Sequence, residues 1–545
     1  MGGGSKSDEE APIARGLSDG GASVYTVDDA IDLCGGFGRF QWFILGFAGL
    51  SWMCDALEVM LLSFLGPAVE CEWHVGPARM GALTSVVFAG MCIGGPLWGA
   101  ISDGWGRRTS FAMSVACTTL FGFLSAAARS YESLLAFRFF VGLGIPGACV
   151  SFGLLMEFVP ASSRGFFLIA IEGFWTIGTI VQAGLAYALL NDHGWRVLVV
   201  VSAIPLAAQL LLLPFVPESP RYLLVKGRTD DAERALSRVL RLCRKNLPEG
   251  RLQALKEKRA GPGEGVSVWR RLGNALSNGA RDIGASVSAL ATPELRGVTA
   301  ALLFIWFVAA FVYYGLVQLV ANVDFLGGSK KECVGDRMHF PREDLLAILV
   351  TAAAEFPGLL LSLLMAHFLS RKLAFSIPMA CIPVVLIPLM TGRLGRAGMI
   401  ACLWLSRFFI YSAYNLLWAI TPELFPTQSR SVALGITNAI SRLGGLVSPY
   451  AAIVAPRKGW PHAAELIFAV FALAAAGAIY IIPRDTAGQR VQDTMEELRE
   501  LSATERALRS SSTATRRRSS RTAGAAGGGG AAERDGAAGG AAKVV

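Results

Sequence analysis

Long apolar runs alternate with short polar segments along this chain. Twelve of these runs are each close to 20 residues long, which is the length of an α-helix that crosses the hydrocarbon core of a bilayer. They predict helices over residues 40–65, 80–101, 109–128, 132–156, 165–190, 196–216, 297–321, 344–366, 373–391, 396–419, 431–454 and 463–482. The pattern therefore predicts an all-α membrane protein with twelve transmembrane helices.

Three polar segments divide the chain. The first is Gly-rich and lacks the apolar core of a cleavable signal peptide. The central one contains DDAERALSRVLRLCRK, whose apolar positions recur with a helical period. The last is rich in Arg, Ser, Gly and Ala and is expected to be a disordered basic tail. The expected domains are a tail over 1–39, a six-helix bundle over 40–216, a central loop over 217–296, a second six-helix bundle over 297–482 and the tail over 483–545.

Positive charge in the short loops predicts the orientation. One side of the predicted bundle carries both tails, the central loop and the loop residues Arg107, Arg108, Arg164, Arg371, Lys372 and Arg430. Because basic loops stay in the cytosol, this side is expected to be cytosolic. The opposite side also carries basic residues, at Lys330, Lys331, Arg393 and Arg396, so the bias is incomplete. The pattern does not identify which membrane, plasma or internal, holds the protein.

The two halves of the chain contain a shared sequence element. The first half reads RFFVGLG…MEFVPASSRG and the second reads RFFIYSA…PELFPTQSRS. The matching residues are Arg138, Glu157, Pro160 and Arg164 in the first half, and Arg407, Glu423, Pro426 and Arg430 in the second. Repeats of six helices with parallel orientation indicate two bundles that rock about a central site.

Composition narrows the choice of function. The chain is 53% hydrophobic and has a formal net charge of +9. Much of the excess positive charge lies in loops between apolar runs, which favours a topological role over nucleic-acid binding. GLGIPG, from Gly142 to Gly147, matches a dinucleotide-binding pattern but lies inside an apolar helix, where small residues serve close helix packing.

The 10 cysteines show no metal-binding spacing. Cys71 and Cys333 both fall in loops on the side expected to be non-cytosolic, and whether they form a disulfide stays open at this stage. We expect no metal, no cofactor and no catalytic residue, so an enzyme is not expected.

The loop after the second predicted helix carries a specific motif. It reads GAISDGWGRR, with Gly99, Asp103, Gly106, Arg107 and Arg108. Glycines permit a tight turn, and an Asp beside paired Arg can clamp helix ends together. This loop resembles the loop motif of the major facilitator superfamily at every position. The equivalent loop of the second half reads HFLSRK, with His367 where an Asp is usual, so the second gate is expected to be weaker or differently built.

Further segments resemble one branch of that superfamily. PESPR at 217–221 resembles the sugar porters, and TSVVFAGM, IEGFWTIGT, GWRVLVVVSAIPL and YYGLVQL resemble the synaptic-vesicle-two-related proteins, whose close relatives carry nicotinate, organic cations or carnitine. The resemblance implies twelve helices in two pseudo-symmetric six-helix bundles and secondary transport by alternating access. Besides the five motif residues, it implies gate residues at Glu157, Arg164, Glu218, Arg221, Arg371, Glu423 and Arg430.

Ionisable residues inside predicted membrane helices are costly, so each needs a partner or a task. Asp55 and Glu58 share a face of the first helix, and Arg138 lies in the fourth helix at a depth similar to that of Asp55. Asp55 and Arg138 resemble the pair that carries the coupling proton in sugar–proton symporters. Two alternatives stay open: a permanent salt bridge with no coupling role, or Glu58 as the titrating group.

Arg442 in the predicted eleventh helix suggests an anionic substrate. Related organic-anion carriers have Arg at this place, and a guanidinium can hold a carboxylate with two hydrogen bonds. The alternative is an Arg that pairs with Glu355 of the eighth helix and serves structure alone.

Aromatic and amide side chains supply further candidates for the site. A flat heteroaromatic substrate can stack on Tyr and Trp rings, although aromatic residues in membrane helices also serve packing. The aromatic candidates are Trp175, Tyr313, Tyr314, Tyr411, Tyr414 and Trp418, and the hydrogen-bonding candidates are Gln182 and Asn415. Glu172, near the cytosolic end of its helix, is expected in a gate network with Arg138 or Arg407.

The sequence predicts a proton-coupled transporter of a small organic solute. The resemblance makes nicotinate the favoured substrate, with Arg442 on the carboxylate, aromatics on the ring, and Asp55 or Glu58 carrying the proton against Arg138. One alternative is an organic-cation or carnitine-like carrier, in which Asp55, Glu58 and Glu355 face the cation. Another is a non-transporting scaffold or receptor with the same fold. The expected partners are the lipid bilayer, the solute and protons, with no nucleic acid.

Overall fold

The computed structural model describes residues 24–160, 163–253, 290, 292–293, 295–322, 332–335, 337–426, 429–483 and 485. All helices and strands belong to one compact unit, residues 1–425 and 429–490. The second unit, residues 426–428 and 491–545, has Pro426 as its one described residue, so the predicted disorder of the basic tail lies outside the described residues.

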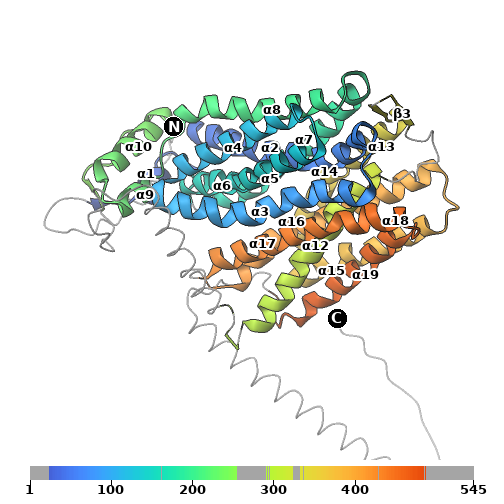
Figure 1. Cartoon of the computed structure of the whole chain (residues 1–545). Coiled ribbons are helices and arrows are strands. Elements are labelled where there is room, and N and C mark those ends of the chain that lie inside the picture. Colours follow the sequence, from blue (N-terminus) through green and yellow to red (C-terminus); the bar gives the residue numbers. More distant parts are fainter. Residues whose placement is uncertain are drawn as a thin grey trace, which may run out of the picture. The chain divides into compact units, whose positions relative to one another are not determined.

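Twelve long helical segments form the unit (Figure 1). The N-terminal half consists of α2 (Arg39–Trp73), α3 (Pro77–Trp105), α4 (Arg107–Ala126), α5 (Tyr131–Gly144) with η1 (Ile145–Gly147) and α6 (Ala148–Glu157), α7 (Arg164–His193), and α8 (Trp195–Leu212) with η3 (Leu213–Phe215). The C-terminal half consists of α12 (Arg296–Asn322), α13 (Arg342–Ala353) with α14 (Glu355–Phe368), α15 (Arg371–Met390), α16 (Arg396–Leu424), α17 (Arg430–Pro449) with the π-helix η4 (Tyr450–Val454) and α18 (Ala455–Arg457), and α19 (Ala463–Ala478) with η5 (Ile479–Ile481).

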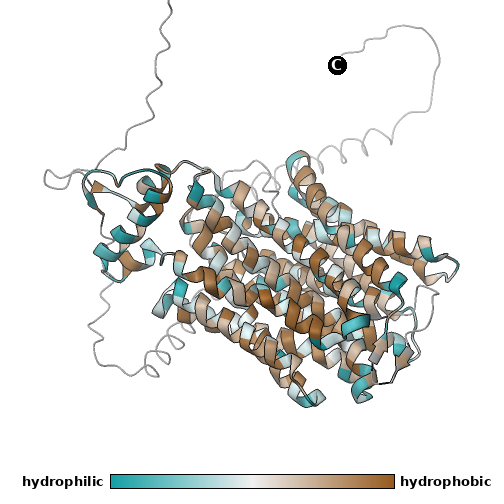
Figure 2. Ribbon diagram, turned by 90° about the horizontal axis from the view of Figure 1, so that it is seen from above, coloured by the Kyte–Doolittle hydropathy of each residue, from teal (hydrophilic) through white to brown (hydrophobic). Residues whose placement is uncertain are grey.

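The predicted set of twelve helices is confirmed. Within the described residues, eleven of the segments are long and apolar enough by themselves to span a bilayer. The exception is the segment of α17, whose interior carries Asn438, Ser441 and Arg442. This helix packs against α12 and α3, so its polar face meets protein. In Figure 2 brown hydrophobic residues cover the long helices and teal residues gather at helix ends.

Glycines set the closest helix approaches in the N-terminal half. A Cβ on Gly142 would overlap the Val87 carbonyl of α3, and one on Gly94 would overlap the Leu143 carbonyl of α5. The GLGIPG segment therefore serves helix packing, as its apolar context predicted. Pro146 lies in the short 3₁₀ turn η1 that separates α5 from α6.

A small subdomain lies outside the membrane helices. It contains α1 (Val27–Asp32), α9 (Pro220–Val225), α10 (Thr229–Leu242) and the parallel pair β1 (Val24–Tyr25) and β2 (Arg251–Leu252). Ile31, Leu223 and Leu236 belong to its apolar core. Helix α10 confirms the helical period of the central segment. Residues 24–33 of the expected N-terminal tail thus fold against the expected central loop.

The two ends of the helix bundle differ, and each is named here after the feature that it carries. The motif face is the end that carries Gly106, Arg107 and the small subdomain. The disulfide face is the opposite end, where Cys71 at the end of α2 is bonded to Cys333 of β3 (Glu332–Val334). Strand β3 pairs antiparallel with β4 (Arg337–His339). The disulfide that the sequence left open is therefore present, and it links the two halves.

Candidate functional site

Arg138 pairs with Glu58, and the expected pairing with Asp55 is wrong. Nη1 of Arg138 lies 2.9 Å from Oε2 of Glu58, and both side chains are fully buried between α5 and α2. Asp55 and Glu58 are three residues apart, which places them about 60° apart around the helix and about 4.5 Å apart along it. That rotation directs Glu58, and not Asp55, toward α5.

Asp55 instead faces the other half of the molecule. Its carboxylate makes no hydrogen bond or ion pair with any residue that the structure describes. The charges that act on it are those of Arg442 in α17 and Glu58. Arg442 is half-buried, and its hydrogen bond to the hydroxyl of Tyr314 is long, at 3.4 Å. A carboxylate and a guanidinium thus oppose one another across the halves with most of their hydrogen-bonding capacity unused by the described side chains.

Aromatic side chains from four helices line this region. Tyr313 and Tyr414 stack with ring centroids 5.8 Å apart, and Tyr313 and Tyr314 make an edge contact at 5.0 Å. The ring centroid of Trp418 is 6.5 Å from that of Trp52, which belongs to the other half. All six predicted aromatic residues join this cluster, together with Trp52 and Trp306, which the sequence analysis did not single out.

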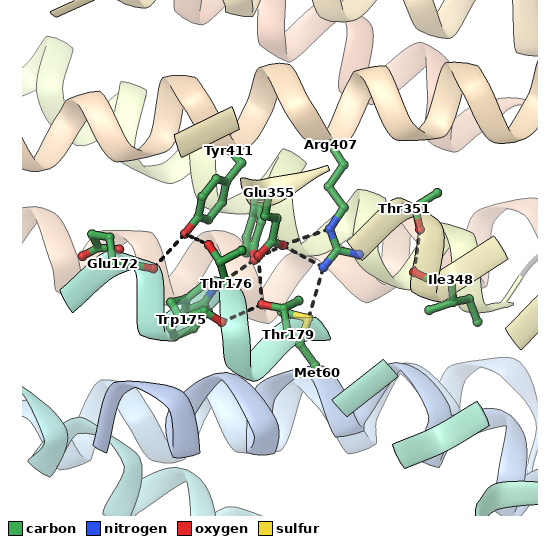
Figure 3. A network of polar contacts seen from close by, with 11 residues as sticks. Met60, Glu172, Trp175, Thr176, Thr179, Ile348, Thr351, Glu355, Arg407 and Tyr411 are labelled. Carbon is green, nitrogen blue, oxygen red and sulfur yellow. Dashed lines mark hydrogen bonds and ion pairs between the residues drawn. The ribbon is translucent and has the colours of Figure 1, made fainter. Parts of the chain in front are cut away.

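Glu355 is the centre of a second buried network (Figure 3). Its Oε1 accepts from Arg407 Nη2 at 2.7 Å and from the Tyr313 hydroxyl at 2.8 Å, and its Oε2 accepts from the Thr179 hydroxyl at 2.8 Å. The alternative in which Arg442 pairs with Glu355 is therefore wrong. Helix α14 packs on α16, which carries Arg407, so this arginine is the one that reaches the carboxylate.

The remaining polar candidates have different surroundings. Gln182 accepts a hydrogen bond from Ser202 of α8 at 2.8 Å, inside the N-terminal half. Asn415 donates to the backbone carbonyl of Tyr411, one turn before it, and its carboxamide oxygen accepts no hydrogen bond from a described residue. Glu172 lies beside Trp52 and pairs with neither Arg138 nor Arg407, so the expected gate network is wrong.

A clamp of charged groups closes the N-terminal half at the motif face. The Nε of Arg107 lies 2.5 Å from Glu157, and Ser219 also donates to this carboxylate. Glu218 accepts from the backbone N–H groups of Arg107 and Arg108 at 2.9 and 3.0 Å. Gly106, between α3 and α4, has a φ of +106°, and a Cβ there would overlap Glu218. The glycine thus permits the turn that brings the arginines to Glu218.

The second half repeats the central pair of this clamp. Arg371 makes two hydrogen bonds to Glu423, of 3.0 and 2.9 Å, although the loop lacks the usual Asp.

The other predicted gate residues also have identifiable surroundings. Arg221 and Arg164 both contact Asp28 of α1, at 2.5 and 3.8 Å. Asp103 lies near Tyr222 of α9, whose pKa is raised by burial and then by Glu218. Arg430 begins α17. The predicted gate residues therefore gather at one end of the bundle.

Comparison with known proteins identifies the family. The sequence profile of the family described as "Sugar (and other) transporter" matches residues 74–273. Organic cation/carnitine transporter 7 of Arabidopsis thaliana is 33% identical over an alignment of 502 positions that covers 88% of this chain and 98% of that protein. Synaptic vesicle 2-related protein of Rattus norvegicus is 33% identical over an alignment of 501 positions that covers 89% of this chain and 86% of that protein. The chain belongs to the synaptic vesicle 2-related branch of the major facilitator superfamily.

Solved structures agree with this assignment at the level of the fold. The inward-open structure of the xylose transporter XylE from E. coli has a TM-score of 0.63 at 18% identity, and covers 85% of this chain and 99% of that chain. As a member of the superfamily, the protein is a multi-pass membrane transporter. Two residues of its site, Thr176 and Thr179, were missed because threonines in a membrane helix give no charge signal in a sequence.

Proposed function

We propose that this major facilitator protein carries a small organic carboxylate across the membrane by alternating access, coupled to protons. Nicotinate is the favoured substrate. The observation that carries the proposal is Arg442, a half-buried guanidinium whose hydrogen bond to Tyr314 is long and which faces the other half. A partly buried guanidinium whose N–H donors lack acceptors is unfavourable in a membrane protein unless an anion binds to it.

The surroundings of Arg442 suit a flat ring attached to the carboxylate. Tyr314, Tyr313 and Tyr414 form a continuous aromatic surface on the C-terminal half. Trp52 and Trp175, 6.4 Å apart, come from the N-terminal half. A heteroaromatic acid would place its carboxylate on Arg442 and its ring among these side chains, touching both halves at once.

Asp55 is the residue that we propose for proton coupling. It has no hydrogen-bonding partner among the described residues and lies under the opposing influence of Arg442 and Glu58. An incoming substrate carboxylate would compete for Arg442 and favour protonation of Asp55, so anion and proton would bind together. Glu58, bonded to Arg138, would keep its charge and hold α2 against α5.

The proposed orientation places the motif face in the cytosol. The two transporting units are the six-helix bundles, and the small subdomain caps the motif face of the N-terminal half through Asp28. The expected central loop contributes the gate residues Glu218 and Arg221, and the expected N-terminal tail contributes Asp28.

A cation or zwitterion carrier is the second candidate. Glu172 and Asp55 are carboxylates without an ion pair among the described residues, and Trp52, Trp175 and Trp418 lie near them. Aromatic faces beside a carboxylate attract quaternary ammonium groups. With Arg442 opposite, the site would also fit a molecule that carries both charges, and a similar protein is named an organic cation/carnitine transporter.

The test is uptake of labelled nicotinate into proteoliposomes, with and without an inward proton gradient. It uses wild type, Arg442→Ala, Asp55→Asn and, as a control, Arg79→Ala, which removes an exposed arginine. We expect gradient-driven uptake that is lost in Arg442→Ala, no longer follows the gradient in Asp55→Asn and is unchanged in the control. Uptake of carnitine but not nicotinate would favour the second candidate, and no flux of any acid, cation or zwitterion would favour a scaffold.

A further inference from the structure

Several hydrogen bonds between described residues join the two halves beside the site. Around Glu355, Thr179 donates to its carboxylate, Trp175 donates to Tyr313 at 3.0 Å, and Tyr411 bonds to Thr176 at 2.9 Å. Other bonds between described residues of the two halves lie toward the disulfide face, from Asn191 to the Phe340 carbonyl at 2.8 Å and from Arg457 to Glu70 at 2.8 Å. The structure is thus closed at the disulfide face.

We propose that Glu355 is a positioning residue that latches the halves together beside the substrate site. The proposal rests on alternating access, as part of the proposed function, but not on the identity of the substrate. For the disulfide face to open, the two halves must separate there, and the hydrogen bond between Thr179 and Glu355 must break. The latch therefore helps to hold that face closed, together with the Asn191–Phe340 and Arg457–Glu70 bonds.

The bonding of Glu355 fits this role. Arg407 and Tyr313 hold the carboxylate from within its own half, at 2.7 and 2.8 Å, so it stays in place when the halves separate. The Thr179 hydroxyl of the other half lies 2.8 Å from this fully buried carboxylate and 2.9 Å from the Trp175 carbonyl of its own helix, so its single proton bonds to one of the two at a time. Because Arg407 and Tyr313 belong to the same half as Glu355, the bond to Thr179 can break and re-form without unfolding either bundle.

The equivalent pair in the first half provides the contrast. Arg138 and Glu58 lie in α5 and α2 of the same half, and their bond does not cross to the other half. Rocking of rigid bundles leaves such a pair intact. Its removal is therefore expected to affect the stability of one bundle, and not the balance between open and closed states.

A small cavity next to the latch offers a place for a reporter. It has a volume of about 10 Å³, which is room for one water. Ser63, Thr179 and Arg407 are among the residues that line it. Ser63 is 3% exposed and lies one turn beyond Met60 toward the disulfide face. A cysteine at this position is shielded while the latch is closed and meets solvent when the disulfide face opens.

The test measures the rate at which a polar thiol reagent labels Ser63→Cys in purified full-length protein without substrate. The background carries Cys71→Ser and Cys333→Ser, so that no covalent bond holds the halves, and labelling is assigned to the residue by mass spectrometry. Thr179→Val removes the inter-half donor at nearly constant volume, and Glu355→Gln weakens the acceptor. The matched control is Thr351→Val, because the Thr351 hydroxyl bonds to the Ile348 carbonyl of its own helix (Figure 3).

We expect Thr179→Val and Glu355→Gln to label roughly tenfold faster or more, the order of effect of one hydrogen bond to a charged group, with Thr351→Val at the parent rate. Equal rates in Thr179→Val and Thr351→Val would overturn the latch. The two proposals fail separately: a shift in labelling without solute flux keeps the latch and removes the transport proposal, and flux without a shift does the reverse.

Discussion

Arg138 and Arg407 lie at matching places in the two repeats, and each guanidinium is bonded to a buried glutamate. Arg138 reaches Glu58 at 2.9 Å and Arg407 reaches Glu355 at 2.7 Å. The surroundings differ, however. Nε and Nη2 of Arg138 have no hydrogen-bond acceptor among the described residues, whereas both Nε and Nη2 of Arg407 bond to Glu355. The arginine of the RFF element is therefore held by a single hydrogen bond to its glutamate in the first half, and by two in the second half.

Glu58→Ala is expected to destabilise the protein strongly. The variant leaves Arg138 as a buried charge without its partner, at a cost of about 3–5 kcal/mol, and thermal unfolding of the purified protein in detergent should begin at a clearly lower temperature. Replacing both Glu58 and Arg138 by Met should recover most of that loss, since no charge then remains. Glu132→Ala, which removes an exposed partner of Arg79, is the control and should change little. A double variant as unstable as Glu58→Ala would contradict the argument.

Gly106→Ala is expected to disturb the clamp at the motif face. At a φ of +106° an L side chain is strained, and its Cβ would also push against Glu218, so the loss is about 1–3 kcal/mol. Gly99→Ala is the matched control, because Gly99 lies within α3 and a Cβ there meets open space. The control should be neutral or slightly stabilising. Thermal unfolding of the two variants side by side tests the difference, and equal unfolding temperatures would count against the role of the turn.

The helices were predictable because span length and apolarity are local properties. Among the described residues α17 falls short on composition, yet it was predicted as an apolar run, and it packs against α12 and α3. The aromatic cluster was also predicted, since these rings lie on helices that the two-bundle architecture turns toward a shared centre. By contrast, the folded part of the N-terminal tail was missed, although Thr26 and Asp29 form a capping box that the sequence displays.

Ion-pair partners could not be derived from sequence in the same way. Choosing between Asp55 and Glu58 requires the rotation of α2 relative to α5, and a change of one residue in register redirects the carboxylate. Choosing between Arg442 and Arg407 for Glu355 requires knowing that α14 packs on α16. Both choices depend on the packing of helices far apart in the chain, which no local pattern records.

Cys34 is expected to resist alkylation while α1 stays docked. Burial, followed by its neighbour Cys243, raises the pKa of the Cys34 thiol to about 12, so that only about one thiol in ten thousand is ionised at pH 8. Iodoacetamide at pH 8 should therefore modify Cys34 far more slowly in the folded protein than in denaturant, as read by peptide mass spectrometry. Ile31→Asp, which places a charge in the core of the small subdomain, should abolish the protection. Equally fast modification in folded and denatured protein would mean that α1 does not remain docked.

Arg442→Lys is expected to weaken binding of the substrate carboxylate even though it preserves the charge. Lysine offers a point charge where the guanidinium offers two parallel donors, and the shorter, more strongly hydrated ammonium would also lose contact with Tyr314. Loss of one of two charge-assisted hydrogen bonds is worth about 1.4 kcal/mol or more, which corresponds to a rise in KM for uptake of about tenfold. Arg79→Lys at an exposed position is the matched control and should leave KM unchanged. If Arg442→Lys transports with the wild-type KM, the residue supplies only positive potential, and the two-pronged grip on a carboxylate is wrong.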